Sequence, residues 1–312
     1  MWQNRPMDTG GGSVPARSRR NMALPFLLAL CALLAVFLPL FVSGDFYFFQ
    51  ATREVGWNPS QDKIPFREIR FESEDGVPLQ GWLLCPRKGP PRGTILFLHG
   101  NAENIGTHTR SVLWLVKAGY EVFTFDYRGY GRSGGKPDIP GVHRDARAAV
   151  AKLLSLPGAS ADRYVVFGQS LGGAVAVETV AATPPPKRPR ALIVDSAFAG
   201  YRRIVRDMVK GYPGGWLVGW PASWLLHDEY SPERWIAKAG PAPVVVIHGT
   251  ADDLVPFEHG KRLHGLAKDP KGFWVDKGGH HIMALSGPAM RARFLAFLKS
   301  VIPPGRGGAC SP

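Results

Sequence analysis

The sequence predicts an α/β fold in which a mostly parallel sheet is flanked by helices. Strand-like apolar runs alternate with runs at helical spacing over residues 64–303. Several of the strand-like runs are mostly apolar, which is typical of parallel strands that are buried on both faces. One of them leads into Gly168-Gln169-Ser170-Leu171-Gly172, after which an Ala/Val-rich helix begins. This is the G-x-S-x-G pattern in its strand-turn-helix context.

Length and composition restrict the function classes. A chain of 312 residues can form one large domain with appended segments. The formal net charge of +13 comes from basic residues that are scattered along the chain without a nucleic-acid-binding motif. We therefore expect a basic surface that favours anionic membranes, and no nucleic acid partner. The three cysteines, Cys31, Cys85 and Cys310, suggest neither a disulfide framework nor a metal site.

The N-terminal part is expected to contain a membrane anchor. Residues 1–21 have the composition of a disordered basic leader. Residues 22–43 are uncharged and apolar, and as a helix they would span roughly 30 Å, enough to cross a bilayer. The alternative is a cleavable signal peptide, because Val42-Ser43-Gly44 offers small residues, and the protein would then be secreted or periplasmic. The arginines before the span predict a cytoplasmic N-terminus and an extracytoplasmic main domain. Residues 44–63 are expected to be a juxtamembrane linker.

The main domain is expected to begin with a hairpin. Residues 66–72 and 77–85 alternate apolar and polar side chains around the turn residues Glu74-Asp75-Gly76. Buried strands are predicted at residues 94–98, 121–125, 164–167, 191–195, 244–248 and 273–275. Helices are predicted at residues 110–118, 142–156, 171–182, 258–267 and 289–301.

The interval 198–242 interrupts this alternation. It contains four of the nine tryptophans, and its glycines and Pro221 prevent one long helix. We expect a short helical lid over a substrate pocket, or alternatively an aromatic packing layer. Residues 304–312 are expected to be a flexible tail.

Ser170 is the candidate nucleophile, and it needs a base and an orienting carboxylate. The base should lie on a late loop, and only His280 and His281 follow the last predicted strand. We select His280 and keep His281 as the alternative.

The carboxylate should follow strand 244–248, where Asp252 and Asp253 are adjacent. We select Asp252, with Asp253 facing solvent and Asp195 as an outside candidate. The chain order is then Ser170, Asp252, His280.

Acyl transfer also requires N–H donors for the carbonyl oxygen as it becomes negative. One donor is expected to be the backbone N–H of Leu171, at the start of the helix after the nucleophile. The other is expected from the loop that begins His99-Gly100-Asn101-Ala102, with the Asn101 backbone first and Ala102 second.

At these residues the chain resembles the α/β-hydrolase superfamily, specifically its serine aminopeptidase-like branch of membrane-anchored hydrolases. The matching segments are residues 99–104, Asp126-Tyr127-Arg128-Gly129-Tyr130-Gly131-Arg132-Ser133, the G-x-S-x-G turn, His248-Gly249-Thr250-Ala251-Asp252 and Gly279-His280. They cover residues 64–302, and His281 stands where asparagine is common in that branch. The resemblance implies an eight-stranded sheet and a metal-independent serine hydrolase.

No cofactor or metal is expected. Gly129-Tyr130-Gly131-Arg132-Ser133-Gly134 is a literal G-x-G-x-x-G, but the following residues cannot open a helix as a dinucleotide site requires.

The leading hypothesis is a membrane-anchored serine hydrolase of the esterase, lipase or thioesterase kind that cleaves small-molecule or lipid-like esters. One alternative is a peptidase or amidase on the same triad, with Asp207, Asp228, Glu229 and Glu233 of the lid receiving a substrate amino terminus. The other is a non-catalytic membrane-bound binding protein.

Overall fold

The computed structural model describes residues 48–312, with the exception of residues 211–219, 222, 225, 306, 311 and 312. The predicted leader and the predicted span at residues 22–43 lie outside the described residues. Within the described part of the chain, no helix has the length and apolar character needed to cross a bilayer.

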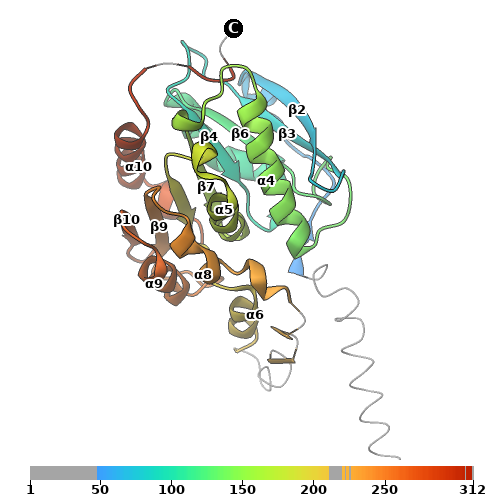
Figure 1. The fold of residues 1–312 in the computed structure, drawn as a ribbon, viewed down its shortest axis with the longest axis vertical. Helices are drawn as coiled ribbons and strands as arrows, with labels where there is room; N and C mark the ends of the chain where they lie inside the picture. The colour runs from blue at the N-terminus through green and yellow to red at the C-terminus, as the bar shows by residue number, and fades with distance from the viewer. Residues whose placement is uncertain (1–47, 211–219, 222, 225, 306, 311–312) are drawn as a thin grey trace, which may run out of the picture. The chain divides into compact units, whose positions relative to one another are not determined.

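The main sheet has eight strands among the described residues, in the order β10-β9-β8-β7-β4-β6-β3-β2 (Figure 1). The strands are β2 (Phe66–Glu72), β3 (Pro78–Leu84), β4 (Thr94–Leu98), β6 (Glu121–Phe125), β7 (Tyr164–Gln169), β8 (Leu192–Asp195), β9 (Val244–Gly249) and β10 (Lys271–Asp276). Neighbours from β10 to β6 pair in parallel, whereas β3 pairs antiparallel with both β6 and β2. The predicted α/β fold with its N-terminal hairpin is therefore confirmed.

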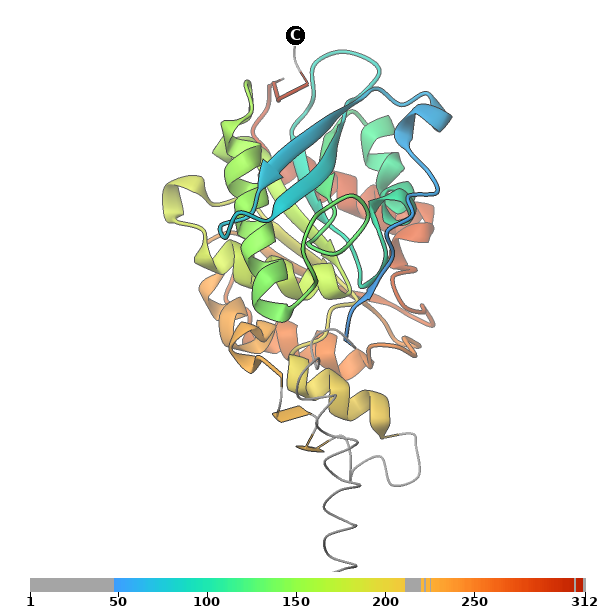
Figure 2. The same ribbon diagram turned by 90° about the vertical axis from the view of Figure 1, so that its right-hand side faces the viewer.

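Helices cover both faces of this sheet, because the central strands are apolar on both faces. In β4, Leu96 and Leu98 belong to the core under α4 (Ile139–Ser155) and α5 (Leu171–Ala182). The alternate residues Ile95 and Phe97 belong to the opposite core. That core includes side chains of α3 (Leu113–Lys117) and α10 (Pro288–Val301), and Figures 1 and 2 show α4 and α10 on opposite sides of the sheet.

The remaining helices are short, apart from α9 (Phe257–Leu266). The helix expected at residues 110–118 is instead divided into α2 (Ile105–His108), the 3-10 turn η2 (Thr109–Val112) and α3. Within the predicted lid, the described residues form α6 (Tyr201–Val209), the 3-10 turns η5 (Asp228–Tyr230) and η6 (Ile236–Lys238), and α8 (Pro232–Trp235). Isolated turns also occur at η1 (Pro59–Asp62), η3 (Ala161–Arg163), η4 (Pro185–Lys187) and η7 (Ala284–Ser286).

The expectation of a simple linker at residues 44–63 is wrong for its described part. Strand β1 (Gln50–Ala51) pairs in parallel with β5 (Ala102–Glu103), and Phe49 is buried. Residues in this segment therefore belong to the folded domain.

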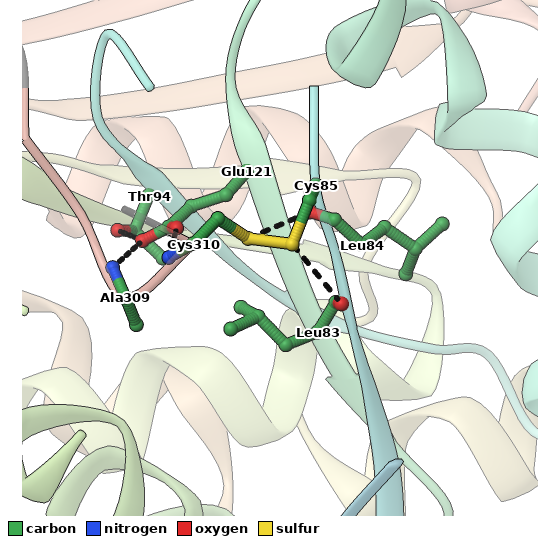
Figure 3. Close-up of a disulfide and its surroundings, with 7 residues drawn as sticks. All are labelled: Leu83, Leu84, Cys85, Thr94, Glu121, Ala309 and Cys310. Carbon is green, nitrogen blue, oxygen red and sulfur yellow. Dashed lines mark hydrogen bonds between the residues drawn. A yellow bond between two sulfur atoms is a disulfide. The ribbon is translucent and has the colours of Figure 1, made fainter. Parts of the chain in front are cut away.

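The described part of the C-terminal tail around Ala309 and Cys310 is also fixed, contrary to the flexible tail expected at residues 304–312. Cys310 forms a disulfide with Cys85, so the expectation that the three cysteines form no disulfide is wrong (Figure 3). The buried carboxylate of Glu121 accepts the N–H groups of Ala309 and Cys310 at 3.1 and 2.9 Å. It also accepts the hydroxyl of Thr94. These contacts attach the tail to strands β4 and β6 next to the end of β3.

Candidate active site

Ser170 lies in the sharp turn between β7 and α5. Its backbone angles are φ 54° and ψ −119°, in a region that a non-glycine residue rarely adopts. A Cβ on Gly168 would collide with the carbonyl oxygen of Gly172, and a Cβ on Gly172 would collide with that of Leu98. Both glycines are therefore required for β7, β4 and α5 to approach closely. The Ser170 N–H donates to the carbonyl oxygen of Asp195 at 2.9 Å, which fixes the turn against β8.

Asp252 lies in the loop after β9, and its side chain is fully buried. Oδ1 accepts the backbone N–H groups of Leu254 at 3.1 Å and Val255 at 2.8 Å. Burial alone would raise the pKa of Asp252, but bonds from His281 and from the Val255 backbone outweigh it and lower the pKa below the usual 3.8. The carboxylate is thus held ionised. Asp253 is exposed, as a solvent-facing neighbour would be.

The structure pairs Asp252 with His281, and this contradicts our choice of His280. His281 Nδ1 lies 2.8 Å from Asp252 Oδ2 and 3.1 Å from Oδ1, whereas the His280 side chain is exposed. The reason is the path of the loop after β10. Gly279 and the backbone of His280 pack against Gly249, and consecutive side chains then point in different directions. Only His281 turns towards the carboxylate.

Hydrogen bonds connect the histidine loop to the serine turn through β8. Ser170 N–H binds Asp195, and the next residue, Ser196, accepts the N–H of Ile282 with its hydroxyl at 3.0 Å. Since β7, β8, β9 and β10 are adjacent and parallel, their carboxyl ends meet at one edge of the sheet. The elements that carry Ser170, Asp252 and His281 therefore converge there.

Asp195 is a different kind of group. It is fully buried, and it accepts a hydrogen bond from Gln169 Nε2 at 2.9 Å and one from the Ser196 hydroxyl at 3.3 Å. Burial raises the pKa of Asp195 to about 6, although the bond from Gln169 offsets part of the effect. Asp195 thus supports the serine turn, and it is Asp252 that contacts the histidine.

The two candidate oxyanion donors lie on neighbouring elements. The N–H of Leu171 is the first in α5, where N–H groups have no partner within the helix and the helix dipole favours negative charge. Asn101 follows β4, which adjoins β7. The Tyr130 hydroxyl bonds Asn101 at its backbone oxygen (2.7 Å) and at Oδ1 (2.9 Å), which orients this loop.

No group of three or more histidine, cysteine or acidic side chains in the described part of the chain is arranged to hold a metal ion. The G-x-G-x-x-G segment follows β6 but does not open a helix, since α4 begins only at Ile139.

A serine turn between a parallel strand and a helix, with an aspartate-histidine pair on later loops, defines the α/β-hydrolase class. Comparisons with known proteins agree. The family described as "Serine aminopeptidase, S33" matches residues 89–227, and the family described as "TAP-like protein" matches residues 219–310.

Two relatives and one solved structure extend this likeness. The chain is 33% identical to the uncharacterized protein YfhR of Escherichia coli (strain K12), over 93% of this chain and 98% of that protein. It is 33% identical to the α/β hydrolase domain-containing protein WAV2 of Arabidopsis thaliana, over 73% of this chain and 77% of that protein. The Pyrococcus furiosus esterase Pf2001 superposes with a TM-score of 0.67 at 25% identity, over 82% of this chain and 98% of that one. The chain belongs to the α/β-hydrolase superfamily.

Proposed function

We propose that the protein is a membrane-anchored serine hydrolase that cleaves carboxylic esters or thioesters. Ser170 Oγ attacks the acyl carbon while His281 Nε2 takes its proton, and Asp252 orients and stabilises the resulting imidazolium. The N–H groups of Leu171 and Asn101 stabilise the oxyanion. His281 then gives the proton to the leaving alcohol or thiol, and a water molecule activated by His281 hydrolyses the acyl-enzyme and restores Ser170.

The observation that carries this proposal is the hydrogen bond from His281 to a buried, ionised Asp252 at the same edge of the sheet as Ser170. An aspartate that binds Nδ1 leaves Nε2 free of that contact and available to a serine hydroxyl. His281, and not His280, is therefore the base in this proposal.

Apolar side chains on the two loops favour an apolar acyl group. Leu254, two residues after Asp252, is 47% exposed, and Met283, two residues after His281, is 51% exposed. In the predicted lid, Met208, Trp220 and Trp224 are also exposed. The name of the similar Pyrococcus structure, an esterase, supports an ester as the substrate.

The test is labelling with a fluorophosphonate probe, which modifies activated serines. We expect one labelled residue, Ser170, and complete loss of labelling in Ser170→Ala. Folded wild-type protein that resists the probe would refute the proposal.

A peptidase or amidase on the same triad is the second candidate, favoured by the description of the matching family as a serine aminopeptidase. The lid carboxylates that we expected to receive an amino terminus are engaged elsewhere. Asp207 contacts His259 at 3.0 Å and Lys210, and Asp228 contacts Arg234 at 2.8 Å. Glu229 pairs with His227, and Glu233 with Arg262 and Arg203. Because these carboxylates already have partners within the protein, they favour the esterase over the aminopeptidase.

Comparing turnover of p-nitrophenyl butyrate with that of aminoacyl p-nitroanilides separates the two candidates. Ester turnover should exceed amide turnover by orders of magnitude. Comparable rates would favour the peptidase.

For location, we propose that residues 22–43 anchor the protein with its N-terminus in the cytoplasm and the folded domain on the extracytoplasmic side. The disulfide between Cys85 and Cys310 supports this, because disulfides persist in oxidising compartments. The domain should be digested by protease added to intact spheroplasts. Digestion only after lysis would place the folded domain on the cytoplasmic side.

A further inference from the structure

The segment from Phe48 to Glu54 lies along the loop that carries the proposed oxyanion donor, residues 99–104. We call the first the N-terminal segment and the second the oxyanion loop. In Figure 2 the blue N-terminal part of the described chain descends from β2 and η1 towards the end of the domain that carries α6. Phe48 contacts Tyr201 of α6 with ring centroids 5.6 Å apart.

The side chain of Asn101 is used to hold this segment. Its Nδ2 donates to the carbonyl oxygen of Phe48 at 2.8 Å, and its Oδ1 accepts the N–H of Gln50 at 3.4 Å. Because Oδ1 also accepts the Tyr130 hydroxyl, the amide is held from two sides. The backbone N–H of the same residue is the proposed donor to the substrate.

Strand pairing continues the contact along the loop. Gln50 pairs with Ala102 and Ala51 with Glu103, and the N–H of Thr52 donates to the carbonyl oxygen of Glu103 at 3.2 Å. Glu103 has φ 63°, which is unfavourable for a residue with a side chain. Such a conformation persists where the surroundings enforce it, and here the pairing with the N-terminal segment does so.

Asn104 closes the other end of the loop. Its Oδ1 caps α2 by accepting the N–H of Gly106 at 2.9 Å. Its Nδ2 donates to the carbonyl oxygen of Glu54 at 2.7 Å and to the hydroxyl of Thr52 at 3.0 Å. One side chain thus joins the N-terminal segment to the helix that follows the loop.

The N-terminal segment is itself fixed to a third loop. The N–H of Gly131 donates to the Thr52 carbonyl oxygen at 2.8 Å, and Arg53 donates to the carbonyl oxygens of Ser133 and Gly135. Phe49 is buried against Tyr130 with ring centroids 6.5 Å apart. The oxyanion loop is therefore held between the segment and Tyr130.

We propose that residues 48–54 are a positioning element of the active site: they set the Asn101 N–H in place for the oxyanion, so turnover depends on chain that precedes the eight-stranded sheet. This rests on the function proposed above. It extends that function because the segment that follows the predicted anchor in the sequence then contributes to the active site.

The test is Thr52→Pro in the full-length protein, which removes the N–H that binds Glu103 and the hydroxyl that binds Asn104 while it leaves the sequence of the oxyanion loop unchanged. Turnover of p-nitrophenyl butyrate should fall about 10- to 100-fold in kcat with little change in KM, a partial form of the 10²- to 10³-fold loss of a whole donor. Hydrogen exchange of the amides in residues 99–104 should become about tenfold faster, whereas exchange in α4 and β7 should not change.

A second pair of variants covers the case in which proline prevents folding. Asn101→Ala keeps the backbone N–H but loses the side-chain bonds, and it should show the same loss in kcat. Asn58→Ala is the matched control, because Asn58 also bonds backbone through its side chain, to Ser60 at 3.0 Å, but does not contact the oxyanion loop. It should behave as wild type.

Thr52→Pro or Asn101→Ala with wild-type kcat and unchanged exchange in residues 99–104 would overturn the inference. If wild-type protein fails to turn over the ester, the proposed function fails instead. The exchange measurement still reports whether the segment holds the loop.

Discussion

The attachment of the C-terminal tail leads to a quantitative prediction. Cys310→Ser removes the disulfide to Cys85, which closes a sequence separation of 225 residues. The chain-entropy relation gives about 5 kcal/mol for a loop of this size, and measured disulfides typically contribute about 2–4 kcal/mol.

The tail also has non-covalent contacts that remain in the variant. Glu121 keeps its bonds from the N–H groups of Ala309 and Cys310 as long as the tail stays in place. We therefore expect the measured loss near the lower figure, about 2–4 kcal/mol, which lowers Tm by roughly 4–15 °C for a domain of this size.

The assay is calorimetric unfolding in detergent, with and without reductant. Reductant should lower the Tm of the wild type to that of Cys310→Ser and should leave the variant unchanged. Cys31→Ser is the matched control, since Cys31 has no part in the disulfide, and it should retain the wild-type Tm and its response to reductant. Equal Tm values for Cys310→Ser and Cys31→Ser, or three free thiols in the native protein, would refute the reasoning.

Two further predictions concern the serine turn and the ion pair between the buried Arg128 and the partly exposed Asp75. Gly172→Ala places a Cβ against the carbonyl oxygens of Leu98 and His99, so it should lower the free energy of unfolding by about 1–3 kcal/mol or more and reduce fluorophosphonate labelling. The control Gly265→Ala has open space around its Cβ, so its free energy of unfolding should equal or exceed that of the wild type. Labelling and stability unaffected by Gly172→Ala would contradict the packing described for α5. Arg128 binds both oxygens of Asp75 at 2.8 Å, and this bond lowers the pKa of Asp75 from 3.8 to about 2. A lowered pKa in the folded state means that the stability from Asp75 is complete above its unfolded pKa and is lost as the pH falls from 3.8 towards 2. Urea unfolding should therefore show a smaller loss of stability over that pH interval in Asp75→Asn than in wild type, and an equal loss would argue against the pair.

Much of the fold could be predicted because its central strands are mostly apolar and buried on both faces. Runs such as Thr94–Leu98 and Val244–Gly249 are buried on both faces, and this is visible in the sequence. The serine turn was equally clear, since a side chain at Gly168 or Gly172 would collide with backbone. Buried strands and sterically restricted turns can therefore be recognised from the residues at those positions.

The features that were not predicted leave no pattern in the neighbouring sequence. Strands β1 and β5 have two residues each, too few for a periodic pattern. Cys85 and Cys310 are 225 residues apart, and their pairing depends on where the completed fold brings the tail. His280 and His281 are adjacent in a loop, so the direction of each side chain depends on loop geometry that composition does not report. In each case the tertiary structure determines which residues come into contact.

The most direct test of the proposed mechanism is the comparison of His281→Ala with His280→Ala. Both remove an imidazole from neighbouring positions, but only His281 contacts Asp252. The account predicts that His281→Ala lowers kcat/KM for p-nitrophenyl butyrate on the order of 10³-fold or more, with the folded structure intact, and that His280→Ala stays within about threefold of wild type. The reverse result, with activity lost in His280→Ala and kept in His281→Ala, would contradict it.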